Sequence, residues 1–124
     1  MPPVVRALRG ATTVDEDEPD HIGERVTALL RELFERNGLD QDDLVSILFS
    51  ATPDLHSTFP ATVARRSLGL GDVPLMNCQE LDVEGALPRC IRVMAHVHTE
   101  RPRAELQHVF LEGATVLRPD LAPR

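Results

Sequence analysis

Residues 90–98, which read Cys-Ile-Arg-Val-Met-Ala-His-Val-His, place an arginine inside a segment that otherwise has the pattern of a buried or half-buried strand. Side chains of a strand point alternately to its two faces, so one face is aliphatic and Arg92 lies on the other. A guanidinium cannot lose its proton, and an unpaired buried charge is costly. Because the strand contains no carboxylate, we expect Arg92 to meet an anion from elsewhere in the fold, from a neighbouring subunit or from a bound anionic small molecule.

The rest of the chain predicts an α+β domain with a mixed β-sheet of about five strands. Apolar residues at helical spacing follow Pro19 and end before Gly38, which predicts one long helix. Its apolar stripe comprises Ile22, Val26, Leu29, Leu30, Leu33 and Phe34. Strands are expected at residues 4–13, 44–51, 73–79 and 90–99, a final strand or hairpin at 108–111 and 114–117, a short helix at 60–68 and a helical turn at 102–106.

One long helix packed on one face leaves the opposite face of such a sheet uncovered. That opposite face carries Arg92, whose charge needs a partner. We therefore expect copies of the same chain to cover it in a symmetric oligomer. Beyond the last expected strand, Pro119 and Pro123 predict an open, mobile tail from about residue 118.

Size and charge narrow the classes of function. The 124 residues suit a single domain spanning 1–124, and the formal net charge of -7 argues against nucleic acid as a partner. No apolar run approaches the ~18 residues of a membrane span, and the N-terminus lacks the features of a secretion signal, so no membrane partner and a cytoplasmic location are expected. All 13 basic residues are arginines, a bias that genomic composition can produce, so only arginines in unusual positions point to function.

The cysteines and histidines form no redox motif and no complete metal site. Cys78 and Cys90 are too far apart for a Cys-x-x-Cys pair, and we expect two buried free thiols. His96 and His98 share a strand face and could chelate a metal ion, but no convincing third ligand accompanies them. We therefore expect no metal.

Five blocks of sequence resemble the monofunctional α/β class of chorismate mutases, which is distinct from the all-helical class. In chain order the blocks begin at Arg9, Ser50, Cys90, His108 and Val116, and they read RGATTV, SATPDLH followed by FPA, CIRVM, HVFLE and VLRPDL. Each block is short, but together and in this order they span nearly the whole chain. The resemblance implies a pseudo-α/β-barrel homotrimer of mixed-sheet subunits, with the long helix outside and the active sites in clefts between subunits.

The reaction that the resemblance implies is the rearrangement of chorismate to prephenate, in phenylalanine and tyrosine biosynthesis. Chorismate is a dianion, and the reaction is a 3,3-sigmatropic shift in which an ether carbon–oxygen bond breaks while a carbon–carbon bond forms. No nucleophile, acid, base, metal or cofactor is required. The rate can come from holding the substrate in its compact reactive shape and from stabilising the charge that develops as the ether breaks.

The resemblance assigns two catalytic residues and one carboxylate-binding residue. Arg92 would donate to the ether oxygen and to a carboxylate of the substrate. Glu80 would bind the substrate hydroxyl and lie near the positive charge that develops on the ring. Arg9 would bind a substrate carboxylate. Each residue also has an interpretation that does not need the resemblance. Arg92 would form a structural ion pair at an interface, Glu80 would be a solvated acid in a loop, and Arg9 would form an ordinary ion pair at the surface.

Four further positions match residues of the implied cleft. Arg65 would lie near its mouth, although the adjacent Arg66 makes a plain solvated pair a close alternative. Phe59 would form an apolar wall, with packing in the core as the alternative. Leu117 and Arg118 precede the tail, and they either close over bound substrate or are simply loose.

Three positions depart from the family pattern. Phe110 stands where the best-known members have tyrosine, so a hydroxyl contact to the substrate is lost while an apolar wall remains. Asn77 stands where the family often has cysteine, and its amide could hydrogen-bond the substrate. Thr62 replaces a lysine near the entrance. We expect a weaker hold on the dianion, with more salt sensitivity resting on Arg65.

Two other functions compete with the mutase activity. The first is a non-catalytic trimeric module that binds a dianion of the aromatic pathway, but such a binder would be free to lose either Arg92 or Glu80. The second comes from fold analogy with trimeric imine deaminases, which also use an interface arginine. The sequence blocks of this chain do not resemble theirs.

Overall fold

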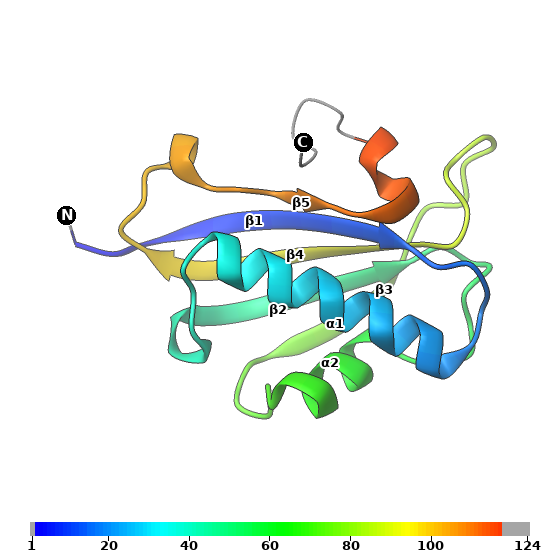
Figure 1. Cartoon of the computed structure of the whole chain (residues 1–124), viewed down its shortest axis with the longest axis horizontal. Coiled ribbons are helices and arrows are strands. Elements are labelled where there is room, and N and C mark those ends of the chain that lie inside the picture. The colour runs from blue at the N-terminus through cyan, green and yellow to red at the C-terminus, as the bar shows by residue number, and fades with distance from the viewer. Residues whose placement is uncertain (1, 118–124) are drawn as a thin grey trace.

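The computed structural model describes residues 2–117 and contains a mixed sheet of five strands (Figure 1). The strands are β1 (Val4–Thr13), β2 (Leu44–Ala51), β3 (Leu75–Gln79), β4 (Cys90–Thr99) and β5 (Val109–Phe110). Their order across the sheet is β3-β2-β4-β1-β5. The central strand β4 is antiparallel to β1 and β2, whereas the outer strands β5 and β3 run parallel to β1 and β2 respectively. The predicted mixed α+β sheet is confirmed.

Two helices, α1 (Pro19–Arg36) and α2 (Pro60–Leu68), lie on one face of this sheet (Figure 1). The expectation of one long helix on that face is therefore confirmed, and the short helix α2 shares the face with it. Short 3₁₀ segments, η1 (Gln41–Asp43), η2 (Arg103–Glu105) and η3 (Glu112–Val116), connect the larger elements. Within residues 2–117, no helix combines the length and the apolar composition that crossing a membrane requires.

Local sequence fixes both ends of α1. Pro19 occupies the first turn, and the carboxylate of Glu18 accepts two backbone N–H groups of that turn at 3.1 and 2.8 Å. At the other end Gly38 has a φ of 60°, a left-handed conformation that glycine adopts at little cost. This turn brings the N–H of Leu39 to the carbonyl of Phe34 at 2.9 Å. The long helix therefore begins and ends where the sequence predicts.

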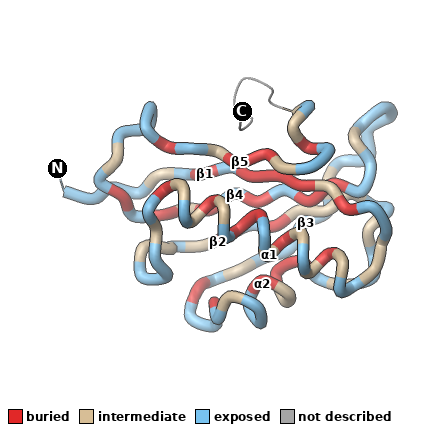
Figure 2. The backbone as a smooth tube through the Cα atoms, viewed as in Figure 1, coloured by how far each residue is buried: buried red, intermediate tan, exposed pale blue. Residues whose placement is uncertain are grey.

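The core lies between the helices and the sheet. Five residues of the predicted helical stripe are fully buried, and Phe34 is partly buried against them. The predicted aliphatic face of β4 meets this stripe. Its residues are Ile91, Val93, Ala95 and Val97. Figure 2 shows the buried positions along α1 and the central strands. The predicted alternation of β4 is confirmed.

The face of the sheet opposite the helices, which we call the free face, carries Arg92. Among the large apolar side chains exposed on it are Leu48 and Met94, each 37% exposed, and Met76, which is 59% exposed. Strand register places these three residues side by side, because Leu48 pairs with both Met94 and Met76. A contiguous exposed apolar patch of this kind is typical of an interaction surface.

The structure differs from the sequence predictions in three places. The strand predicted at 73–79 begins at Leu75, because Val73 closes a turn with its N–H on the carbonyl of Leu70 at 3.2 Å and Pro74 has no N–H to donate. The strand or hairpin predicted over 108–117 is the two-residue strand β5 followed by η3. A hydrogen bond from the N–H of Ala114 to the carbonyl of Leu111, 3.0 Å long, holds the first turn of η3.

The third difference concerns the thiols. Cys90 is buried as predicted, but Cys78 is exposed. The reason is that Cys78 lies on the edge strand β3 with its side chain on the free face, which no helix or strand among residues 2–117 covers at that strand.

Candidate active site

Arg92 lies on the free face near the first end of the central strand β4 and contacts a carboxylate of its own chain. Its neighbours across the strands are Ala11 on β1 and Ser50 on β2. The Nε atom of Arg92 lies 3.2 Å from Oε2 of Glu80. The arginine side chain is 52% exposed and the glutamate side chain 22% exposed. The expected anionic partner is therefore present in the fold. Within residues 2–117 the Arg92 side chain is only partly covered, and its cover by copies of the chain stays a prediction.

Glu80 follows the last residue of β3, and two contacts hold it. Its backbone N–H donates to the carbonyl of Ala51 at 2.9 Å, which extends the parallel pairing of β2 and β3 by one residue. Its carboxylate oxygen Oε2 accepts a hydrogen bond from the hydroxyl of Ser50. The oxygen that contacts Arg92 is thus also the oxygen that Ser50 contacts.

Two hollows of about 260 Å³ flank the Arg92–Glu80 pair. One is lined by residues of the loop after Glu80, together with Thr52 and Cys90, and the other by Leu48, Ser50, Cys78 and Met94. Burial raises the pKa of the Cys90 thiol, and the charge of Arg92 offsets this rise only in part. Cys90 is therefore a protonated, unreactive neighbour of the pair at neutral pH.

Three more of the sequence-predicted residues lie on the same side of the sheet. Arg9 pairs with Met94 across the strands and is exposed. Phe110 is 4% exposed and forms a small second core with Ala11, and Leu117 packs against this cluster. Arg118, which the sequence also assigned to the site, lies outside the described residues.

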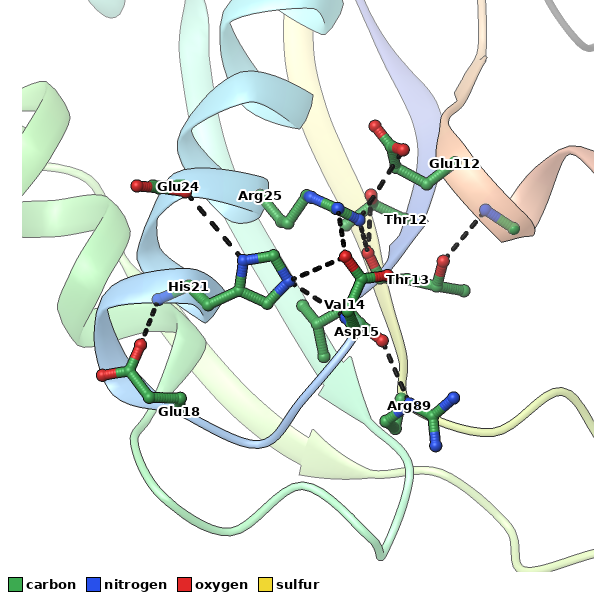
Figure 3. Close-up of polar contacts among 11 residues, drawn as sticks. Thr12, Thr13, Val14, Asp15, Glu18, His21, Glu24, Arg25, Arg89 and Glu112 are labelled. Atoms are coloured by element: carbon green, nitrogen blue, oxygen red, sulfur yellow. Dashed lines mark hydrogen bonds and ion pairs between the residues drawn. The ribbon is translucent and has the colours of Figure 1, made fainter.

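Arg25 of α1 ties η3 to the end of β1 (Figure 3). Its guanidinium donates to the carbonyl of Thr13 at 2.7 Å and to the carboxylate of Asp15 at 3.0 Å. It also lies 3.7 Å from the carboxylate of Glu112. The N–H of Gly113 in turn donates to the hydroxyl of Thr13 at 2.9 Å. These contacts fix the segment that leads to Leu117.

The other predicted residues lie around α2, on the helix side of the sheet. Phe59, at the N-terminal end of α2, is 64% exposed and lines a cleft of about 440 Å³ together with Asn77. The side-chain oxygen of Asn77 accepts the N–H of Ala61 at 3.0 Å, so Asn77 caps the first turn of α2 from β3. Arg65 is exposed in the last turn of the same helix.

The described candidates thus fall into two groups on opposite faces of the sheet. The first group, on the free face, comprises Arg9, Glu80, Arg92, Phe110 and Leu117. The second group, around α2, comprises Phe59, Arg65 and Asn77. The edge strand β3 lies between them, and its Cys78 lines hollows on both sides.

A family model described as chorismate mutase type I matches residues 5–121 of the chain. The chain belongs to this family. The resemblance inferred from the five sequence blocks is therefore confirmed.

Individual members of the type I family are similar along almost their whole length. The chain is 45% identical over 119 residues to chorismate mutase AroH of Bacillus subtilis (strain 168). This alignment covers 96% of this chain and 94% of that protein. It is 44% identical over 119 residues to chorismate mutase AroH of Thermus thermophilus, covering 95% and 97%. The solved chorismate mutase of Clostridium thermocellum has a TM-score of 0.87 and 46% identity, covering 90% of this chain and 98% of that one.

Sequence reasoning missed three residues that support the candidate site of this family member. Ser50 lies within a matched block, but only the strand register shows that it reaches Glu80. Arg25 and Asp17 belong to charged stretches for which the sequence predicts no particular partner. Their side chains instead hold chain segments together across 10 to 40 positions of sequence. No local pattern signals contacts over such separations.

Asp17 anchors the loop that leads to Phe59. Its carboxylate accepts the backbone N–H of His56 at 3.2 and 3.1 Å and that of Ser57 at 3.1 Å. The Ser57 hydroxyl, the two backbone N–H groups and the charge of His56 lower the pKa of the Asp17 carboxyl, against the opposing effect of desolvation. The anchored loop forms part of the cleft around α2.

We expect Asp17→Asn to lower the unfolding free energy by about 1–3 kcal/mol at neutral pH, because one partner of several hydrogen bonds is lost. Because the pKa of the Asp17 carboxyl is lower in the folded protein than its ordinary value of 3.8, the carboxylate stabilises the fold fully when the pH is above 3.8. This contribution is lost as the pH falls through the lower pKa of the folded state. Urea unfolding from neutral pH to about pH 3 should therefore show the two curves converging below that ordinary value. A gap that stays constant over this range contradicts the anchor, and Asp72→Asn, an exposed change, is the control.

Proposed function

We propose that this chain is a chorismate mutase that converts chorismate to prephenate in the biosynthesis of phenylalanine and tyrosine, in the cytoplasm. The observation that carries the proposal is the pairing of Arg92 and Glu80 on the free face, 3.2 Å apart and accessible. Arg92 offers a fixed cation to the ether oxygen, which gains negative charge in the reaction. Glu80 offers a carboxylate to the substrate hydroxyl and to the ring, which gains positive charge. Family membership supplies the substrate.

Arg92 is the proposed electrostatic catalyst. As the ether carbon–oxygen bond breaks and the new carbon–carbon bond forms, electron density moves onto the ether oxygen, and no proton has to be transferred. A guanidinium that donates to this oxygen stabilises the transition state more than the ground state. The bonding electrons shift within one molecule, so the reaction requires no cofactor to supply or accept electrons.

Glu80 and Arg9 are the proposed orienting groups. Glu80 accepts a hydrogen bond from the substrate hydroxyl, and Arg9 pairs with a carboxylate of the dianion at the same face of the sheet. Holding both ends of a flexible substrate favours its compact reactive shape. Phe110 and Leu117 supply an apolar boundary, and Arg118 closes the site in the same proposal.

A complete site then requires two chains. Phe59, Arg65 and Asn77 lie on the helix side of the sheet, whereas Arg92 lies on the free face, and in this proposal a neighbouring chain brings the second group to the substrate. The exposed apolar patch of Leu48, Met76 and Met94 supports a neighbouring copy on the free face. We therefore propose a homotrimer whose active sites lie between adjacent subunits.

The activity is tested by mixing the purified protein with chorismate and following the ultraviolet absorbance of chorismate together with prephenate formation. We expect a rate at least ~10⁶-fold above the uncatalysed reaction, as for a typical enzyme. A folded trimer without acceleration would instead favour the non-catalytic binding module. The family match and the named relatives give no support to that alternative.

A further inference from the structure

Ser50 lies on β2 between the two residues that carry the proposed chemistry. Across the strands it pairs with Arg92 on one side and with Cys78 on the other. Its hydroxyl donates to Oε2 of Glu80, the same oxygen that lies 3.2 Å from Nε of Arg92. One carboxylate oxygen therefore receives both a neutral donor and a cation.

The backbone alone does not fix the carboxylate of Glu80. The hydrogen bond from its N–H to Ala51 at 2.9 Å holds the main chain, but a glutamate side chain keeps three rotatable bonds. Attraction to Arg92 favours a fork in which both carboxylate oxygens face the guanidinium. Such a fork would engage two of the five N–H donors of Arg92 and both oxygens of Glu80 at once.

The Ser50 hydroxyl competes with that fork. The hydrogen bond from this hydroxyl holds Oε2 towards β2. We propose that Ser50 is a positioning residue that holds Glu80 ready for the substrate hydroxyl and keeps Arg92 from being fully engaged by Glu80. This inference rests on the proposed chorismate mutase function and adds a residue to the machinery of the same site.

The main test is a double-mutant cycle with Ser50→Ala, Glu80→Ala and the combined variant. We expect Ser50→Ala to lower kcat by ~10- to 100-fold with a smaller change in KM, because a misplaced group costs rate more than ground-state binding. In the Glu80→Ala background the same change should cost less than about twofold, since Ser50 then has no carboxylate to hold. Equal losses in both backgrounds, or a Ser50→Ala variant within about twofold of the wild type, would overturn the proposal.

Two further variants separate positioning from folding. Ser50→Thr keeps a hydroxyl at a strand position that suits threonine and should recover most of the rate. Ser46→Ala is the matched control, because Ser46 lies on the same strand and face with its hydroxyl 3.3 Å from Nδ1 of His96. It should leave kcat unchanged. A similar loss in Ser46→Ala, or no recovery in Ser50→Thr, would show that the effect is general to the strand.

A crystal structure of Ser50→Ala gives a readout that does not depend on activity. We expect the Glu80 carboxylate to turn so that both of its oxygens contact the Arg92 guanidinium. An unchanged carboxylate overturns the positioning role whatever the kinetics. If the wild-type protein does not accelerate chorismate rearrangement but the carboxylate turns as expected, the proposed function fails while the structural coupling of Ser50 to Glu80 stands.

Discussion

Replacing Arg92 by lysine is expected to lower kcat by ~10²- to 10³-fold while the protein stays folded. Lysine keeps the positive charge but loses the planar fork of donors, and removing one preplaced donor to a developing oxyanion typically costs about 3–4 kcal/mol of barrier. Folding should be little affected, because the Arg92 side chain is 52% exposed in the single chain and surface ion pairs contribute about 1 kcal/mol or less. Steady-state kinetics with chorismate and thermal unfolding measure the two effects separately.

Arg31→Lys is the control for this change, because Arg31 is an exposed arginine on α1. It should leave both kcat and the unfolding temperature unchanged. Near-normal turnover in Arg92→Lys would refute the role assigned to the guanidinium. A large loss of stability in that variant would show instead that the Arg92–Glu80 pair serves the fold.

Mixing two inactive variants is expected to restore activity if each site takes one group of residues from each of two chains. Arg92→Ala removes the cation on the free face, whereas Phe59→Asp places a negative charge in the wall where the dianion has to lie. Aspartate suits the N-cap position that Phe59 occupies, so α2 should persist. Random assembly of equal amounts of the two chains in a cyclic trimer leaves about a quarter of the sites with both halves intact.

The matched control mixes Arg92→Ala with Glu80→Ala, two changes on the same half of the proposed site. This pair should recover no activity, because every site then lacks one of the two groups. Equal recovery in both mixtures, or none in either, contradicts a site shared between adjacent subunits. Size-exclusion chromatography with light scattering establishes that the mixed assemblies form.

Periodicity predicted the parts of the fold that depend on local sequence. The alternation of β4 and the helical spacing of α1 each reflect the need to bury one apolar face, and both elements have the predicted ends. The segment after Phe110 was mispredicted because η3 depends on contacts from elsewhere. The hydroxyl of Thr13 holds Gly113, and the charge of Arg25 faces Glu112.

The candidate site divides in the same way. Alternation in β4 singled out Arg92 and its need for an anion, but it could not say which carboxylate supplies it. Pairing with Glu80 depends on the parallel register of β2 and β3, which short-range patterns do not encode. The same register brings Ser50 to that carboxylate. Asn77 was assigned to the substrate, and its side-chain oxygen is already used to cap α2.

The structure of the protein with a bound dicarboxylate analogue that retains a bridging ether oxygen tests the central claim most directly. We predict that a guanidinium nitrogen of Arg92 lies about 2.7–3.2 Å from that oxygen, within hydrogen-bond distance. Phe59 of an adjacent subunit should close the other side of the ligand. A guanidinium that remains paired with Glu80 and out of reach of the ether oxygen would contradict the account.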